Sequence, residues 1–312
     1  MTPHNSSERR ADVANWCKGL ECPSCTICRT IDAKPYPQGS FHLNLAPPLG
    51  VMRCQRCGLS FLSPRPDASL RSALFAGEIP EVLKPYGAQV AHYSAVTETR
   101  ADVFQERLTV LSDLAARNIA GRRPKLLDVG ASSGVLVQKA RASGWDAEGI
   151  EPSVEGRREA RNRQIELLDS AAESLPFSAA TFDVVHAHHV FEHLADPLRA
   201  AGEARRVLRP GGLLFVEVPN QLDNVSFRRD MCFRRVHQRE RNMRSIHHLW
   251  FFSRRTLRGL FAKAKFQSLG TEDVYGAPAY GWKASLSFLT RGMGKIAFGG
   301  PIVRAWGYKP EE

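Results

Sequence analysis

Two kinds of segment are missing from this chain of 312 residues. Its N-terminus carries no apolar run of the kind found in secretory signals. No uncharged apolar stretch approaches the length that a membrane span requires. We therefore expect a cytoplasmic protein without a transmembrane segment. The hydrophobic content of 43% supports a substantial core, and the length leaves room for one α/β domain plus a smaller module.

Acidic residues are in short supply relative to basic ones. The chain has 32 Asp and Glu against 43 Lys and Arg, which gives a net charge of +11. Such a surplus favours anionic partners, namely phosphorylated small molecules, nucleic acid or a membrane surface. Arginines gather between Arg228 and Arg244, where their guanidinium groups suit phosphate or carboxylate. A solvated charged helix face is the alternative interpretation of that segment.

The chain has seven cysteines, an odd number, and the missing export signal together with the length of the chain argues against a disulfide framework. Four cysteines form two C-x-x-C pairs, Cys22 with Cys25 and Cys54 with Cys57, whose thiolates can surround a zinc ion. Cys28 makes another C-x-x-C with Cys25, so the ligand set is open to an alternative. We predict a structural zinc site with Cys22, Cys25, Cys54 and Cys57 as preferred ligands.

The segment from Lys125 to Gly134 predicts a strand, a tight turn and a helix. The apolar run contains Asp128, and Gly130 and Gly134 allow close approach of backbone to a ligand. Glu151, at the end of a second strand-like run, can accept hydrogen bonds from ribose hydroxyls. The loop is neither G-x-G-x-x-G nor a P-loop, which disfavours dinucleotides and triphosphates. An acid before the first glycine suits a cationic nucleoside without phosphate, such as S-adenosylmethionine.

With these motifs the chain resembles the class I S-adenosylmethionine-dependent methyltransferases, over roughly residues 121 to 274. Ser132 stands where the family has its middle glycine, while the segments 174–185 and 208–218 match the approach to the fourth strand and the fifth strand. The resemblance implies an α/β, Rossmann-like seven-stranded sheet. Residues 58–67 and 247–253 also resemble the bacterial members that carry an N-terminal zinc ribbon.

The resemblance also implies which residues line the cofactor. The family often places an acid near the adenine amino group, and that position corresponds to Ala171 here, so adenine recognition falls to backbone, Asp169 or Ser170. The residues expected at the cofactor are Asp128, Gly130, Ala131, Ser132, Gly134, Glu151, Ala172 and His188.

The motifs divide the chain into five predicted parts. We expect a flexible N-terminus over 1–19, a zinc ribbon over 20–66, a helical connector over 67–120, a methyltransferase domain over 121–290 with a basic substrate-covering insertion at 220–250, and a C-terminal tail over 291–312. Within the ribbon, the alternation from Phe41 to Leu45 predicts a strand. Asp67 and Ser253 are expected to cap helices. The segment 285–306 mixes apolar and basic residues and could contact a membrane surface or cover the sheet edge.

Candidate bases follow the predicted fourth strand. Ligands bind at the carboxyl ends of parallel strands, so His188 to His193 should face the cofactor, whereas His186 should be packed in the sheet. The predicted catalytic residues are His189, Glu192, His193 and His248. A divalent metal held by His189, Glu192 and His193 is a weaker alternative, based on resemblance to quinone O-methyltransferases.

These observations favour a methyltransferase that acts on an anionic small-molecule acceptor, such as a sugar, a glycolipid or a secondary metabolite. The alternative is an rRNA or tRNA methyltransferase, because a ribbon and a basic chain also suit nucleic acid. The expected cofactors are S-adenosylmethionine as co-substrate and zinc.

Overall fold

The fold was analysed in a computed structural model of the chain. It describes residues 19–43, 45, 49–75, 101–116, 119, 122–233, 247–274 and 301–311. The predicted flexible N-terminus, most of the arginine-rich segment and the mixed apolar and basic segment before residue 301 lie outside these ranges.

The elements of the described residues alternate between strands and helices from residue 125 onward. The N-terminal part contains β1 (Leu20–Glu21), β2 (Ala33–Pro35), α2 (Pro37–His42), β3 (Val51–Cys54), β4 (Ser60–Leu62), β5 (Arg65–Pro66), α3 (Ala68–Phe75) and α4 (Ala101–Ala115). The remainder contains β6 (Lys125–Val129), α5 (Val135–Ala142), β7 (Asp146–Ile150), α6 (Val154–Asn162), β8 (Phe182–His188), α7 (Pro197–Val207), β9 (Leu208–Pro219), α8 (Val225–Phe233), β10 (Trp250–Phe251), α10 (Arg254–Lys263), β11 (Gln267–Val274) and β12 (Ile302–Tyr308).

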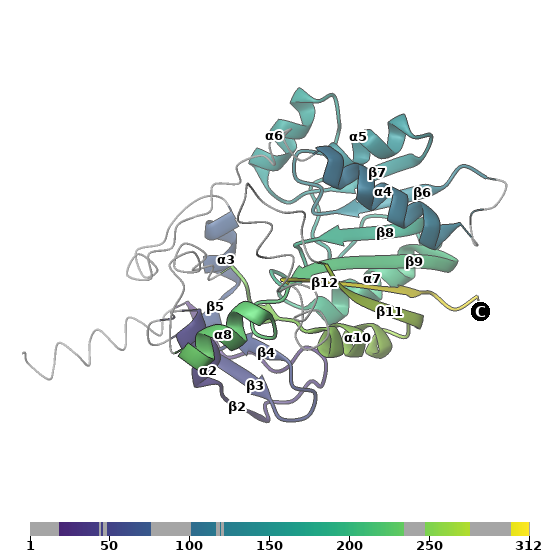
Figure 1. The fold of residues 1–312 in the computed structure, drawn as a ribbon. Coiled ribbons are helices and arrows are strands. Elements are labelled where there is room, and N and C mark those ends of the chain that lie inside the picture. Colours follow the sequence, from purple (N-terminus) through teal and green to yellow (C-terminus); the bar gives the residue numbers. More distant parts are fainter. Residues whose placement is uncertain are drawn as a thin grey trace, which may run out of the picture.

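The main sheet has the order β11-β12-β9-β8-β6-β7 (Figure 1). Strands β7, β6, β8 and β9 are parallel, whereas β12 and β11 are antiparallel to their neighbours. The α/β class is therefore confirmed. The described residues form six strands in this sheet rather than seven, because beyond β7 the chain makes only a single parallel bridge, Ile150 to Leu168.

Both faces of this sheet are covered by helices. Along β6, Leu126 belongs to the core cluster shared with α4 and α5, whereas its neighbour Leu127 belongs to the cluster shared with α7 and α10. Successive side chains of a strand point to opposite faces, so one strand serves two cores. β8 is buried throughout except at its last residue, His188, as expected for a central parallel strand. The functional groups must therefore lie at the strand ends.

Two predicted helix caps are confirmed. The Asp67 carboxylate accepts a hydrogen bond from Leu70 N at 3.0 Å just before α3. Ser253 and Thr256 form a reciprocal capping box at the start of α10. These local hydrogen bonds satisfy the free amides at a helix N-terminus.

The cysteine-containing module is less independent than predicted. Its four-stranded sheet has the order β10-β4-β3-β2, and β10 comes from Trp250 and Phe251, far outside the predicted limits of 20–66 (Figure 1). The strand predicted from the alternation beginning at Phe41 is wrong, because residues 37–42 form helix α2. Pro37 is its first residue, where the fixed φ of proline favours a helical start.

The C-terminal boundary at 290 is also corrected. Strand β12 lies between β9 and β11 and pairs with both, so residues 302–308 belong to the main sheet rather than to a tail. Its residues Val303 and Ala305 are almost fully buried, so the strand contributes to the core. Among the described helices, none has both the length and the apolar character needed to cross a bilayer.

Candidate functional site

The turn after β6 lies against the end of β7. Gly130 and Ala131 both donate their backbone N–H to Ile150 O at 2.9 Å. Gly130 and Gly134 adopt φ values of 69° and 72°, and Ser132 adopts 50°. These left-handed conformations favour glycine, which has no Cβ to clash. The predicted glycine turn is therefore present, and the small side chain of Ser132 is accommodated in it.

Gly130 is also required for packing. A Cβ built on it would lie 2.5 Å from Val190 Cγ2, and one on Gly134 would lie 2.9 Å from Ile165 Cγ2. The turn after β6 therefore touches the loop after β8, which we call the post-β8 loop (residues 189–196). This contact brings the predicted cofactor turn and the predicted catalytic residues to one edge of the sheet.

Glu151 follows β7 and is 1% exposed. One of its carboxylate oxygens accepts from Ser132 N and the other from Ser153 N, each at 2.8 Å. Burial raises its pKa, while these two amides favour the charged form. Each oxygen retains a second lone pair that could accept a ribose hydroxyl. The carboxylate thus joins the glycine turn to the start of α6.

Asp128 and His186 form a buried pair on adjacent strands. The Asp128 carboxylate lies 2.7 Å from His186 Nδ1, and the imidazole stacks on Phe215 at a centroid distance of 5.9 Å. His186 is 2% exposed. It is packed in the sheet, as predicted.

The segment predicted to lie near adenine follows the bridge at Leu168. Ala172 is buried, whereas the Asp169 side chain is 68% exposed and pairs with Arg157 at 2.9 Å. The Ser170 hydroxyl donates to Ser174 O at 3.0 Å and to Ala171 O at 3.3 Å. The groups that would contact adenine thus stay a prediction.

His188 belongs to a buried charged network that sequence reasoning missed. The carboxylate of Glu217 receives Arg107 Nε at 2.7 Å on one oxygen and Arg304 at 2.8–2.9 Å on the other. Arg107 also lies 2.9 Å from His188 Nε2, and Glu217 Oε2 lies 3.1 Å from His188 Nδ1. Burial lowers the pKa of His188 to about 3. A neutral His188 is therefore fixed at the end of β8, and its contact with a cofactor stays a prediction.

Glu217 itself remains ionised. Burial alone would raise its pKa, but His188, Arg107 and Arg304 hold that pKa well below the usual range. The three partners come from α4, β8 and β12, and in the sequence only the polar Glu217 and Arg304 within apolar strands signalled such a network.

The predicted catalytic residues gather in one cluster. The Glu192 carboxylate is 1% exposed, with Oε1 3.1 Å from His189 Nδ1 and 3.8 Å from His193 Nε2. Burial raises the pKa of Glu192, but the hydrogen bond from His189 and the neighbouring His193 lower it to about 2. The rings of His193 and His248 meet edge to face at 4.7 Å. His189 has a φ of 54° and the most exposed side chain of the four, at 37%.

Two of these histidines have their Nδ1 atoms engaged. His193 Nδ1 lies 2.9 Å from the carbonyl oxygen of His247, and His248 Nδ1 lies 2.7 Å from Gln221 Oε1. Because both partners are acceptors, each Nδ1 carries the proton and each Nε2 is left with a lone pair when the ring is neutral. The groups able to hold a metal here are Glu192, His193 and His248, so His248 replaces the predicted His189.

The cysteine cluster differs from the predicted set in one member. Sulfur atoms of Cys25, Cys28, Cys54 and Cys57 lie within 4.8 Å of one another, whereas Cys22 is exposed and not part of this group. The preference for Cys22 over Cys28 is therefore wrong.

The two cysteine turns repeat the same backbone geometry, which explains this choice. Gly58, after the second pair, has a φ of 81° and donates N–H to Cys54 O. Arg29 has a φ of 53° and donates N–H to Cys25 O in the same way. Cys25 and Cys28 thus form the first turn, with Arg29 at the position that glycine marks in the second.

Comparisons with known proteins show the family of this chain. Residues 99–269, more than half of the chain, match the methyltransferase-domain family. The chain is 27% identical over 180 residues to the ubiquinone biosynthesis O-methyltransferase of Parvibaculum lavamentivorans, covering 51% of this chain and 68% of the relative. It is 31% identical over 130 residues to that of Rhizobium leguminosarum bv. trifolii, covering 37% of this chain and about half of the relative, 51%. A crystal structure of a SAM-dependent methyltransferase from Thermotoga maritima is similar at 22% identity and a TM-score of 0.44, covering 67% of this chain and 97% of that one.

Proposed function

The chain belongs to the class I S-adenosylmethionine-dependent methyltransferase family, and from this premise we propose that it methylates a hydroxyl of an anionic small molecule. One observation carries the proposal. The glycine turn, Glu151 and the histidines of the post-β8 loop lie at the carboxyl ends of neighbouring parallel strands. A donor held at β6 and β7 would therefore have candidate bases next to it.

The proposed cofactor contacts follow from this edge. Glu151 would accept the ribose hydroxyls, while the turn from Gly130 to Gly134, with Ala131 and Ser132, would approach the methionine part through backbone. Asp128 precedes the turn in β6 and is bonded to His186, while Ala172 and His188 would flank the adenosine. These assignments are supported by position on the strands rather than by a bound molecule.

We propose His189 as the base. Its Nδ1 faces the buried Glu192 carboxylate, which would orient the ring and stabilise its protonated form, leaving Nε2 for the acceptor. In the reaction, the acceptor oxygen attacks the methyl carbon as the carbon–sulfur bond breaks. Sulfur keeps the electron pair, S-adenosylhomocysteine leaves, and the hydroxyl proton passes to His189. His193 and His248 would line the same space.

The anionic class of acceptor is supported by a hollow beside the ribbon. It has a volume of about 440 Å³ and is lined by Tyr36, Arg53, Leu222, Asp223, Phe227, Arg228, Met231 and Cys232. Arg228 pairs there with Asp223 at 3.2 Å, and Arg53 lies over the Tyr36 ring at 5.1 Å. A guanidinium group next to an aromatic ring suits a sugar phosphate, a glycolipid or an acidic metabolite. The relatives are named as ubiquinone biosynthesis O-methyltransferases, which supports oxygen as the methylated atom.

We also propose that Cys25, Cys28, Cys54 and Cys57 hold a structural zinc ion. The Cys25 and Cys57 sulfurs lie 3.6 Å apart, close to the edge of about 3.8 Å expected for tetrahedral zinc with 2.3 Å zinc–sulfur bonds. Burial and the neighbouring thiols raise the pKa of Cys28 to about 11. Four thiolates so close together would repel one another, and a zinc ion would neutralise that charge.

Two measurements test the methyltransferase. Calorimetric titration of S-adenosylhomocysteine into the wild type should give heat that Glu151→Ala abolishes. Transfer of a labelled methyl group should be followed with a panel of phenols, nucleotide sugars and glycolipids. His189→Gln should reduce transfer by about 10²–10⁴-fold while sparing S-adenosylhomocysteine affinity. Full activity of His189→Gln would remove the proposed base.

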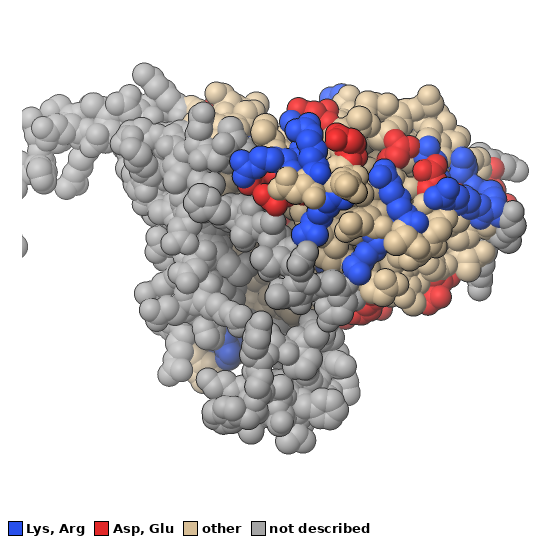
Figure 2. Space-filling model, turned by 90° about the horizontal axis from the view of Figure 1, so that it is seen from above, with Lys and Arg blue, Asp and Glu red and all other residues tan. Residues whose placement is uncertain are grey.

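RNA remains the second candidate acceptor because of the net charge of +11. On the face seen in Figure 2, however, basic side chains are interspersed with acidic ones, in keeping with pairs such as Arg158 with Glu155. RNA retention over a salt series distinguishes the two, since binding through phosphates weakens steeply as salt rises.

A further inference from the structure

The first cysteine turn, Cys25 to Arg29, is hydrogen-bonded to the end of the post-β8 loop. Thr26 donates its hydroxyl to Asp196 Oδ1 at 2.9 Å, and Arg29 donates to Asp196 Oδ2 at 2.7 Å. Asp196 is also the N-cap of α7, and Leu198 N bonds both Asp196 and the Thr26 hydroxyl. Thr26 is 2% exposed, whereas the side chains of Arg29 and Asp196 are 50% and 28% exposed, so only the Thr26 part of this contact is buried. We call the cysteine-containing module, residues 20–66 together with β10, the ribbon. The ribbon thus completes the cap of helix α7 of the methyltransferase domain.

A second contact involves the two residues before Asp196. Trp250 donates its indole N–H to Leu194 O at 2.7 Å, and Arg65 donates to Ala195 O at 3.3 Å. Trp250 is 1% exposed and packs on Phe61 of β4 at a centroid distance of 5.6 Å. Two successive carbonyl groups of the loop are therefore held from the ribbon side.

A third contact reaches Glu192 itself. Its backbone carbonyl accepts from Leu249 N at 2.7 Å and Trp250 N at 3.2 Å. This segment continues into β10, which pairs with β4, and Leu62 N donates to Leu249 O at 2.9 Å. The backbone that carries the buried Glu192 carboxylate is thus attached to the edge of the ribbon sheet.

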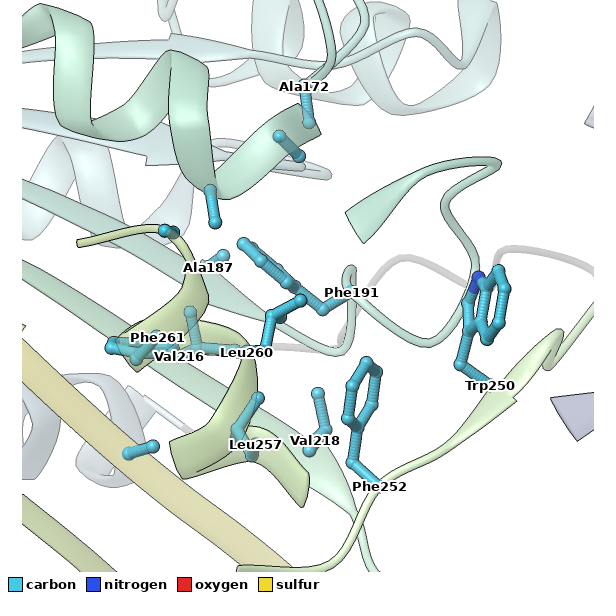
Figure 3. Close-up of a cluster of buried hydrophobic side chains, with 14 of the residues drawn as sticks. Ala172, Ala187, Phe191, Val216, Val218, Trp250, Phe252, Leu257, Leu260 and Phe261 are labelled. Atoms are coloured by element: carbon cyan, nitrogen blue, oxygen red, sulfur yellow. The ribbon is translucent and has the colours of Figure 1, made fainter. Parts of the chain in front are cut away.

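The opposite side of the loop is fixed by the main core. Phe191 is 2% exposed and belongs to one apolar cluster with Ala187 and Leu260, and Trp250 lies at the margin of the same cluster in this view (Figure 3). The loop is therefore held between the core and the ribbon. Its contacts with the ribbon fall on the residues that surround His193.

We propose that the ribbon is a positioning module for the post-β8 loop: through Thr26, Trp250 and β10 it sets where Glu192, His189 and His193 stand. The chemical use of those side chains rests on the function proposed above, but their placement does not. Thr26 and Trp250 are positioning residues, and displacement of a catalytic group by about 1 Å can reduce a rate by about 10²-fold.

Hydrogen exchange of the full chain tests this inference without an acceptor. Thr26→Val keeps the shape of the side chain and removes only its hydroxyl, and Trp250→Phe removes the indole N–H through an independent contact. The matched control is Thr181→Val, since the Thr181 hydroxyl donates to Ser178 O at the opposite end of β8. We expect the amides of His193 and Leu249 to exchange about tenfold faster in the two ribbon variants.

The same variants should leave the glycine turn undisturbed. The amides of Gly130 and Gly134 should keep wild-type exchange, and the ring resonances of His189 and His193 should shift in the ribbon variants but not in the Thr181→Val control. The inference is overturned if loop exchange and ring resonances stay unchanged in both ribbon variants, or if exchange rises equally throughout the chain. Titration with S-adenosylhomocysteine tests the proposed function separately. If the wild type did not bind S-adenosylhomocysteine, the proposed function would fail, but the hydrogen-exchange result would still stand.

Discussion

Substitution of Glu217 tests how much the buried charged network of β8, β9 and β12 stabilises the fold. Its carboxylate is 2% exposed and receives Arg107 on one oxygen and Arg304 on the other. Substitution Glu217→Gln keeps the shape but replaces one oxygen by an NH₂ group. Whichever way the amide turns, an N–H donor then faces a guanidinium donor.

The expected cost follows from the burial of the partners. The side chains of Arg107 and Arg304 are only 9% and 8% exposed, so neither charge is well solvated when its partner is neutral. Breaking a buried pair from one side costs about 3–5 kcal/mol. At about 2–4 °C per kcal/mol for a domain of this size, the melting temperature should fall by about 6–20 °C.

Thermal and urea unfolding followed by circular dichroism provide the measurement. The control is Glu272→Gln, the same chemical change at a carboxylate that also pairs with Arg304 at 2.8 Å but is 47% exposed. Solvent screening limits its contribution to about 1 kcal/mol or less. Equal losses in the two variants would refute the argument that burial makes the Glu217 network strong.

Three further predictions concern the site, the metal and the response to pH. Gly130→Ala should abolish S-adenosylhomocysteine binding in calorimetry, because the added Cβ would meet Val190 Cγ2 at 2.5 Å. Adding Val190→Ala to this variant should restore part of the binding. A double variant that binds no better would contradict a steric cause. Cys28→Ser should lose bound zinc in metal analysis while Cys22→Ser retains one equivalent, and the reverse would reinstate the set preferred from sequence. Burial lowers the pKa of His248 to about 3, so the unfolded chain gains a proton there below about pH 6.5 and the folded chain does not. The unfolding free energy should therefore fall on acidification from pH 6.5 toward 4, by up to about 1.4 kcal/mol per pH unit for this group, with a shallower slope in His248→Gln urea melts.

Features that depend on neighbouring residues in the chain were predicted correctly from the sequence. The turn at Gly130 and Gly134, the caps at Asp67 and Ser253, and the burial of His186 within a strand all depend on neighbours in the chain. Spacing alone does not define the first cysteine turn, because both overlapping C-x-x-C pairs satisfy it. The positions of the sulfur atoms, and the backbone at Arg29 in the conformation usually given to glycine, distinguish Cys28 from Cys22.

Contacts between distant segments decided the rest. Nothing near Trp250 in the sequence indicates that it extends the ribbon sheet and bonds the loop after β8, and nothing near Arg107 indicates a partner in β9. The gathering of His248 with Glu192 and His193 is of the same kind.

The amino-acid sequence by itself determined the α/β class, the glycine turn, and the acids within β6 and after β7, because backbone conformation and strand periodicity act over a few residues. Tertiary structure alone decided which cysteines meet, which strands complete each sheet and which charges are buried together. Those outcomes depend on how strands and helices from distant parts of the sequence pack together. The residues next to a position in the sequence do not show which distant residue it will contact.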